Sequence, residues 1–102
     1  MIRFEWDPMK ARTNQRKHGI TFEEAVNVFD DPDALFEQDR SDEETGEPRW
    51  QALGLVGGMV LLLVAHTVRA DDPDEVIRLI SARRATRKER KRYEQTRAED
   101  VG

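Results

Sequence analysis

The chain has 102 residues, a formal net charge of −4 and no cysteine. A chain of this length supports one modest hydrophobic core, so residues 1–102 are predicted to form a single domain. The lack of cysteine excludes disulfides and thiolate metal sites. No secretion signal or apolar run of membrane-spanning length is present, which predicts a cytoplasmic protein without membrane contact.

Positive and negative charges are segregated along the chain. Residues 1–20 carry five basic and two acidic side chains, whereas residues 21–48 carry one basic residue and eleven acidic ones. Residues 76–97 carry nine basic and two acidic side chains. The net negative charge argues against generic nucleic-acid binding, but phosphates respond to the local field within a Debye length of about 10 Å. The sequence therefore predicts a cationic face on an acidic body.

Apolar patterning predicts five strands. They are residues 2–6, 34–38, 49–56, 59–68 and 76–82. Gly57-Gly58 suits a tight primed turn, so the third and fourth strands are predicted to form a hairpin. The fourth strand begins with a continuous apolar run, which is typical of a central strand covered on both faces.

Capping signals predict three helices. Their starts, in chain order, are Asp7-Pro8, Thr21-x-x-Glu24 and Thr86-x-x-Glu89, and the last two have the spacing of a capping box. Gly19 suits the end of the first helix, Asp30-Asp31-Pro32 the end of the second, and the polar segment 40–48 is predicted to be a loop. The element order predicts an α+β domain: a small antiparallel sheet of about four or five strands, two N-terminal helices on one face, and one C-terminal helix.

The stretch from Val76 to Glu94 joins an apolar strand to a strongly cationic helix. A strand that ends in guanidinium groups suits the binding of an anion, because planar guanidinium makes bidentate contacts with phosphate oxygens. A solvated surface helix is the alternative interpretation, and for a charge run considered alone it is the more common one.

Several short motifs lie in a fixed order along nearly the whole chain. They are F-x-W-D from Phe4, Asn14, Lys17-His18-Gly19-Ile20, Phe22-Glu23, Ala25, Glu47-x-Arg49, Gly54, Thr67-x-Arg69, Ile80-Ser81-Ala82-Arg83 and Glu89 to Tyr93. This pattern resembles the BrnT toxins of BrnT–BrnA toxin–antitoxin systems. The resemblance implies a RelE-like fold, ribonuclease activity without a cofactor, and neutralisation by a cognate BrnA-like antitoxin. It also implies that operator DNA is bound only indirectly, through the toxin–antitoxin complex.

Metal-independent RNA cleavage requires a base for the 2′-hydroxyl, an acid for the leaving 5′ oxygen, and cations for the phosphorane. Arg49, Arg69 and Arg83 lie at or near predicted strand ends and are candidates for the cations. Glu47 and Lys17 are candidates for the base. A metal site is not predicted, because the carboxylates lie mostly in loops and the histidines are far apart.

The C-terminal helix supplies the candidates for RNA binding. They are Arg84, Arg87, Lys88, Arg90, Lys91 and Tyr93. Tyr93 could stack on a base, but core packing is favoured because it shares a helical face with Ala85 and Glu89. His18 is predicted to stabilise a helix end, and His66 and Trp50 are predicted to lie in the core.

Three classes of function remain open. The favoured one is an endoribonuclease toxin that arrests growth until an antitoxin covers its cationic helix. The alternative is a non-catalytic module that docks an acidic partner through that helix, and an RNA-cleavage assay in chelator separates the two. A DNA-binding regulator acting alone is the weakest interpretation, because the sequence has no helix-turn-helix signature.

Overall fold

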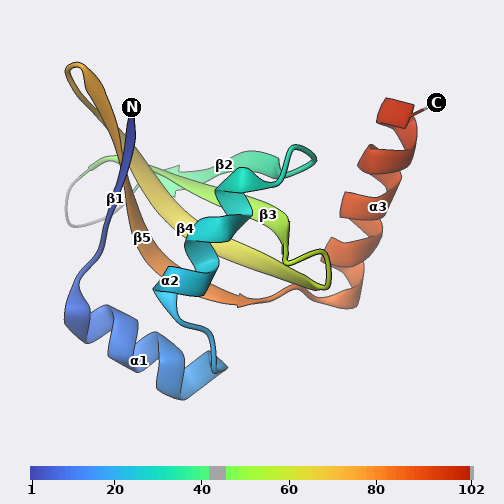
Figure 1. The fold of residues 1–102 in the computed structure, drawn as a ribbon, viewed down its shortest axis with the longest axis horizontal. Helices are drawn as coiled ribbons and strands as arrows, with labels where there is room; N and C mark the ends of the chain where they lie inside the picture. Colours follow the sequence, from blue (N-terminus) through green and yellow to red (C-terminus); the bar gives the residue numbers. More distant parts are fainter. Residues whose placement is uncertain (42–45, 102) are drawn as a thin grey trace.

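A five-stranded sheet forms the body of the molecule in the computed structural model, which describes residues 1–41 and 46–101 (Figure 1). The strands are β1 (Ile2–Glu5), β2 (Leu35–Ser41), β3 (Pro48–Val56), β4 (Val60–Asp71) and β5 (Asp74–Arg84). The helices are α1 (Pro8–His18), α2 (Phe22–Ala25), the 3₁₀ helix η1 (Val26–Asp30) and α3 (Arg87–Val101). The predicted α+β class and strand number are confirmed. None of these helices is long and apolar enough to cross a membrane.

The strands lie in the order β1-β5-β4-β3-β2. The pairs from β2 to β5 are antiparallel, as predicted, and β1 runs parallel to β5. The sheet is therefore mixed. Apolar alternation identifies a strand but does not encode the direction of its neighbour, and a parallel pair needs only a long crossover. Here the crossover contains all the other strands and both N-terminal helices.

The predicted caps and turns are present. The Asp7 side chain accepts from the amide of Met9 at 2.8 Å, and Gly19 ends α1 with φ of 70°. Capping boxes are formed by Thr21 with Glu24 and by Thr86 with Glu89. Gly57 and Gly58 have φ of 62° and 70° in the β3–β4 turn. The predicted second helix ends where expected, but its second half is η1. Part of the predicted loop 40–48, residues 42–45, lies outside the described residues, and Ser41 pairs with Pro48 at its base.

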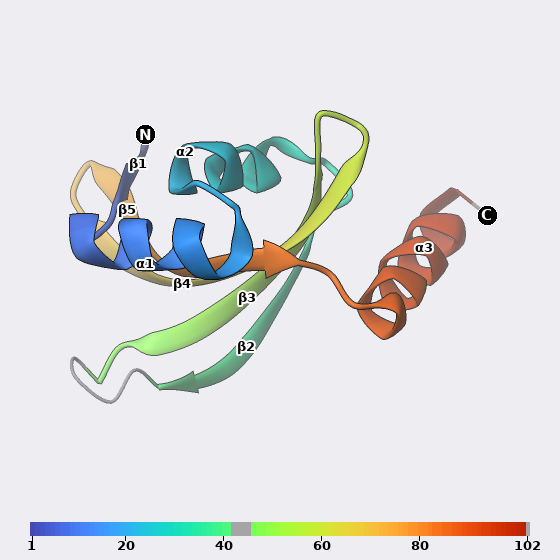
Figure 2. The ribbon, with the colours of Figure 1, turned by 90° about the horizontal axis from the view of Figure 1, so that it is seen from below.

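One face of the sheet, the helix-covered face, carries the main core. Phe22, Ala25 and Val28 of α2 and η1 pack against apolar side chains of β3, β4 and β5. The buried side chain of Asn14 ties α1 to β5, because its Nδ2 donates to the Ala82 carbonyl at 2.8 Å and its Oδ1 accepts from the Ala82 amide at 3.0 Å. Figure 2 shows α1 and α2 on the same side of the sheet, with α3 standing away from both.

The opposite face, the open face, has a smaller apolar cluster at one end. Leu53, Leu61 and Leu63 pack there against Tyr93 of α3. The other end of the open face, toward the β4–β5 turn, carries polar side chains. The fold therefore offers two different surfaces on one sheet: a face covered by helices and a face with an apolar end and a polar end.

Candidate functional site

A row of polar side chains crosses four strands on the open face. Arg49 of β3 lies opposite Thr67 of β4, Thr67 lies opposite Arg78 of β5, and Arg78 lies beside Glu5 of β1. Side chains directly opposed in a sheet have Cβ atoms about 4.5–5.5 Å apart, so neighbours along this line can contact one ligand together. We call Glu5, Arg49, Thr67 and Arg78 the polar row.

Two donor atoms at adjacent positions of the polar row have no hydrogen-bond partner. Thr67 is buried, with 1% of its surface exposed, and its Oγ1 makes no hydrogen bond. The Nε of Arg49 is likewise buried and unpaired. Leaving such a group unsatisfied costs about 1–3 kcal/mol, so folded proteins rarely place two together without a functional reason. A hydroxyl and a guanidinium N–H at one place suit an anion with several oxygen atoms.

Arg69 and Glu47 flank the polar row. Arg69 follows Thr67 by two residues on β4 and forms an ion pair with Glu5 of β1. The hydrogen bond from Arg69 is the main cause that lowers the pKa of Glu5, and the charges of Arg78 and Arg3 lower it further. The bond to Glu5 raises the pKa of Arg69, with a smaller contribution from the charge of Glu47. Guanidinium and carboxylate groups therefore lie close to one another at this end of the sheet.

The structure brings together three of the five predicted catalytic residues: Arg49, Arg69 and Glu47. The two arginines come from neighbouring strands, β3 and β4, and Glu47 lies just before β3. Lys17 is not part of the row. It lies in the last turn of α1 and lines a pocket with Ile80 and Ser81.

Arg83 also lies outside the polar row. It is five residues beyond Arg78 on β5, which corresponds to about 16 Å along a strand. Its guanidinium donates to both carboxylate oxygens of Glu89 in the first turn of α3, at 2.9 and 3.0 Å. The same carboxylate accepts from the amide of Thr86 at 2.8 Å. These contacts join the end of β5 to the start of α3.

The junction between Arg83 and Glu89 predicts a loss of stability in acid. The hydrogen bonds from Arg83 lower the pKa of Glu89 from 4.5 to about 2. Because the folded pKa is depressed, the stabilisation is fully present above pH 4.5 and is lost as pH falls toward 2. We expect Glu89→Gln to be less stable than the parent at pH 7 and to lose less stability between pH 4.5 and 2. Urea unfolding across this range tests it, and parallel pH curves for the two proteins would contradict it.

Tyr93 is buried rather than available to RNA, so its candidate role in base stacking is wrong. Only 4% of its surface is exposed, and its hydroxyl donates to Asp31 Oδ2 at 2.6 Å. Burial and this bond raise the pKa of Tyr93 to about 12. Asp31 Oδ2 also accepts from the amide of Leu55 at 2.8 Å, so one carboxylate connects η1, β3 and α3. The competing prediction, that Tyr93 packs in the core, is confirmed.

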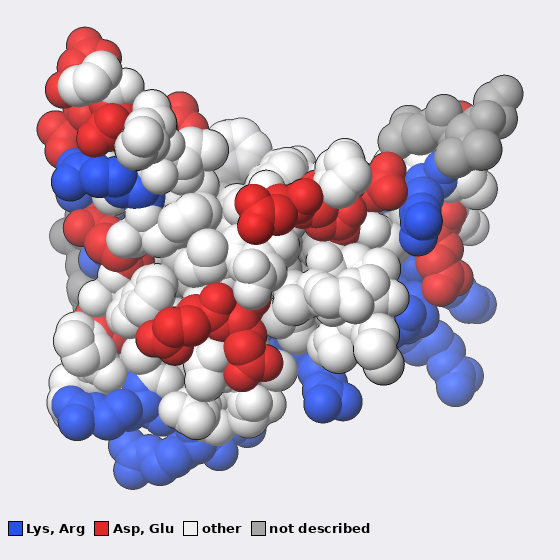
Figure 3. All heavy atoms as spheres, viewed as in Figure 1, with Lys and Arg blue, Asp and Glu red and all other residues white. Residues whose placement is uncertain are grey.

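The other predicted RNA-binding side chains are accessible. Arg84 at the end of β5 is exposed, as are Arg87, Lys88, Arg90 and Lys91 of α3. Figure 3 shows basic side chains projecting from α3 and, separately, from the region of α1. Acidic side chains gather between these two groups, over α2 and η1. The predicted segregation of charge is therefore present on the folded surface.

The predicted core histidine is confirmed. His66 is 2% exposed, burial lowers its pKa, and its Nδ1 lies 3.3 Å from the Val64 carbonyl oxygen. Trp50 is half-buried on the helix-covered face. His18 ends α1 directly before Gly19, at the negative end of the helix dipole.

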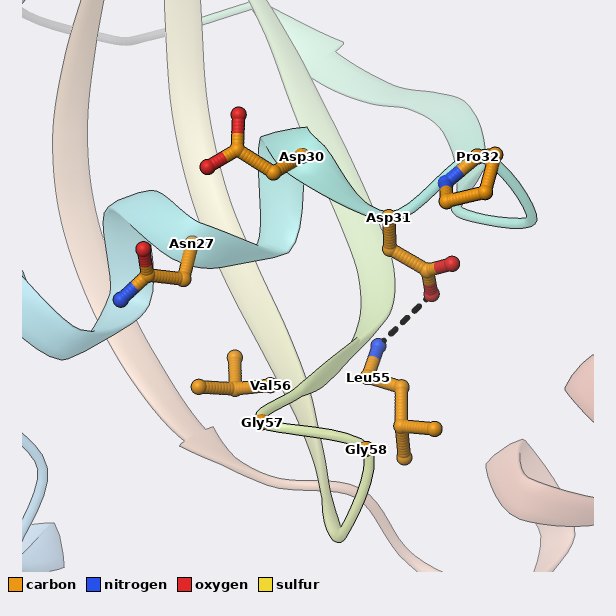
Figure 4. Close-up of a pocket in the computed structure, with 8 residues that line it drawn as sticks. All are labelled: Asn27, Asp30, Asp31, Pro32, Leu55, Val56, Gly57 and Gly58. Carbon is orange, nitrogen blue, oxygen red and sulfur yellow. Dashed lines mark hydrogen bonds between the residues drawn. The ribbon is translucent and has the colours of Figure 1, made fainter.

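A cavity near the end of η1 has the wrong chemistry for a phosphate. It has a volume of about 570 Å³ and lies between η1 and the β3–β4 turn. Figure 4 shows its lining, in which the only charged side chains among the described residues are Asp30 and Asp31. The dashed line in Figure 4 marks the bond from the Leu55 amide to Asp31. Two carboxylates without a cationic neighbour in the lining would repel RNA.

The fold and the polar row define a small α+β protein with a candidate site of arginine, threonine and glutamate side chains on one sheet face. A family model described as "Ribonuclease toxin, BrnT, of type II toxin-antitoxin system" matches residues 6–89. The chain therefore belongs to the BrnT family of ribonuclease toxins. Among solved structures, the Brucella abortus ribonuclease toxin BrnT has the same fold, with a TM-score of 0.65 and 22% sequence identity over 85% of this chain and 100% of that one. A comparison with proteins of curated function gave no match.

Proposed function

We propose that this toxin cleaves RNA internally at the polar row, without a metal ion, and that a cognate antitoxin neutralises it. The observation that carries the proposal is the pair of unpaired donors, Arg49 Nε and Thr67 Oγ1, beside the guanidinium of Arg78. Family membership supplies the ribonuclease activity. The row supplies a place where a phosphodiester can be held by fixed positive charge.

In the proposed reaction, the 2′ oxygen of the substrate attacks the adjacent phosphorus. Glu47 accepts the 2′-hydroxyl proton, the new 2′ O–P bond forms, and the bond from phosphorus to the 5′ oxygen breaks. The leaving 5′ oxygen takes a proton from solvent water. Arg49, Thr67 and Arg78 hold the non-bridging oxygens, whose negative charge grows in the phosphorane-like transition state. The products are a 2′,3′-cyclic phosphate and a free 5′-hydroxyl end.

Glu47 is a better base in this scheme than the other nearby carboxylate. Glu5 is held by Arg69, and the hydrogen bond that lowers its pKa also makes it a weaker proton acceptor. Lys17, the other base predicted from the sequence, lies on α1 with Ile80 and Ser81. The exposed basic residues of α3 have a different proposed role, which is to contact phosphates farther along the RNA.

The reaction is tested with purified protein, a labelled RNA and an excess of chelator. We expect cleavage to persist in chelator and the products to carry cyclic phosphate ends. Glu47→Gln should lower the single-turnover rate by about 10²–10⁴-fold, the usual contribution of a general base, with RNA affinity little changed. The matched control is Glu23→Gln, an exposed carboxylate on α2. A requirement for added Mg²⁺ would contradict the metal-free mechanism, and a parental rate in Glu47→Gln would remove Glu47 from it.

A further inference from the structure

An apolar groove crosses the helix-covered face beyond the end of η1. Its cavity has a volume of about 310 Å³ and is lined by residues from all five strands and from η1, including Ile2, Phe29, Phe36, Trp50 and His66. Phe36 is 50% exposed and Ile2 is 53% exposed, at opposite ends of the groove. Large apolar side chains that remain half-exposed around a concave surface are typical of an interaction site.

The floor of the groove is preformed. The ring of Phe29 lies 4.9 Å from that of His66 and 6.0 Å from that of Phe36, with the rings of Phe36 and His66 6.4 Å apart. These are the separations of favourable tilted and edge-to-face aromatic pairs. Because burial lowers the pKa of His66, the floor is uncharged at neutral pH. An apolar side chain entering the groove would therefore meet a fixed apolar surface.

The surroundings of the groove are acidic. Glu75 is its only charged lining residue among the described residues, and Asp30 follows Phe29 at the end of η1. Figure 3 shows acidic side chains over α2 and η1, and acidic side chains beside a basic group at the β4–β5 end, with uncharged surface between the two regions. Such a rim repels RNA phosphates and attracts Lys and Arg. The polar row lies on the opposite face of the sheet, so the groove is a separate site.

We propose that this groove docks a segment of the antitoxin in which one or two large apolar side chains are flanked by basic residues. The apolar side chains fill the space between Phe36 and Ile2, and the basic residues face Glu75 and Asp30. The choice of partner rests on the proposed function, in which an antitoxin neutralises this protein. The groove supplies affinity for the antitoxin from the face opposite the polar row. A toxin with a substitution in the groove therefore remains an active enzyme.

The experiment measures binding of the purified antitoxin of the same system to three toxin variants by surface kinetics. Phe36→Glu and Ile2→Glu place a charge at opposite ends of the groove. Met59→Glu is the matched control, because Met59 is 82% exposed at the β3–β4 turn and does not line the groove. We expect the two groove variants to bind about 10–100-fold more weakly, the range for truncating a central anchor, and Met59→Glu to bind like the parent. Glu75→Lys should slow association and reduce its salt dependence.

RNA cleavage by the same variants shows whether the groove binds the antitoxin or RNA. We expect parental cleavage rates, so that cells producing Phe36→Glu stop growing even when the antitoxin is co-produced. Parental antitoxin affinity in both groove variants would overturn the proposal, as would loss of binding only when Arg87, Lys88 and Lys91 are replaced by Glu. Weak RNA binding by the groove variants with intact antitoxin binding would instead assign the groove to RNA bases.

Two further controls keep the result decisive. Thermal unfolding of each variant identifies a loss of fold, and Phe36→Ala replaces Phe36→Glu if the charged variant does not fold. If the parent protein fails to cleave RNA, the proposed function fails, but the affinities of the variants for the antitoxin still decide whether the groove is its docking site.

Discussion

Replacing Arg78 by alanine is expected to reduce RNA cleavage by about 10²–10³-fold, the usual cost of removing one positioned donor to a transition-state oxyanion. Arg78 lies between Thr67 and Glu5 in the polar row, at the centre of the proposed contacts with the phosphate. The single-turnover rate at saturating RNA is the measurement. Arg49→Ala should lower the cleavage rate by a similar factor. Arg12→Ala is the control, because Arg12 is exposed on α1.

The same assay distinguishes the polar row from the end of β5. Arg83→Ala is expected to keep a cleavage rate close to the parental one and to unfold at a lower temperature, because its guanidinium holds Glu89 at the start of α3. If Arg83→Ala loses cleavage as strongly as Arg78→Ala while remaining folded, the reacting phosphate sits near Arg83 and the polar row is not the site.

The second large effect is expected at Tyr93. Tyr93→Ala removes a buried aromatic ring from the cluster with Leu53, Leu61 and Leu63, and such truncations cost about 3–5 kcal/mol of unfolding free energy. Tyr93→Phe removes only the hydroxyl and leaves Asp31 with one bond fewer, at about 1–3 kcal/mol. Urea unfolding measures both. A tyrosine that stacked on RNA would show the reverse pattern, with stability unchanged and RNA affinity reduced.

The hydroxyl of Tyr93 also predicts a loss of stability in base. Its pKa is raised from 10.0 to about 12 in the folded protein. A raised folded pKa stabilises the protein below the unfolded pKa, so this contribution is present below pH 10 and is lost as pH rises from 10 toward 12. The phenylalanine variant lacks it and should lose less stability over that interval.

Local chemistry made the caps predictable. Asp7, Gly19 and the two capping boxes depend on neighbours within a few residues, and each was placed correctly from spacing alone. The parallel pairing of β1 was not predictable in this way. Nothing in the alternation of Ile2, Phe4 and Trp6 states which strand will lie beside them, because that choice depends on residues more than seventy positions away.

The residues of the candidate site could be predicted in part for the same reason. Thr67 and Arg69 lie two residues apart on β4, so they share a face whatever the register, and Glu47 lies two residues before Arg49 at the start of β3. Arg78 and Glu5 join the row only through the pairing of β4 with β5 and of β5 with β1. Arg83, a candidate cation in the sequence, lies outside the row and pairs with Glu89. Glu89, the acidic residue of the capping box, lies close enough along the chain to accept hydrogen bonds from the Arg83 guanidinium.

The place of β1 at the edge of the sheet has a consequence for the growing chain on the ribosome. Ile2 pairs with Glu75, so β1 has no neighbouring strand until β5 has been synthesised. At synthesis rates of about 5–20 residues per second, this wait is roughly 4–15 s, plus the time for β5 to leave the exit tunnel. The polar row needs β3, β4, β5 and β1 together. The polar row, the candidate site, is therefore assembled only after β5 has been made and has left the exit tunnel.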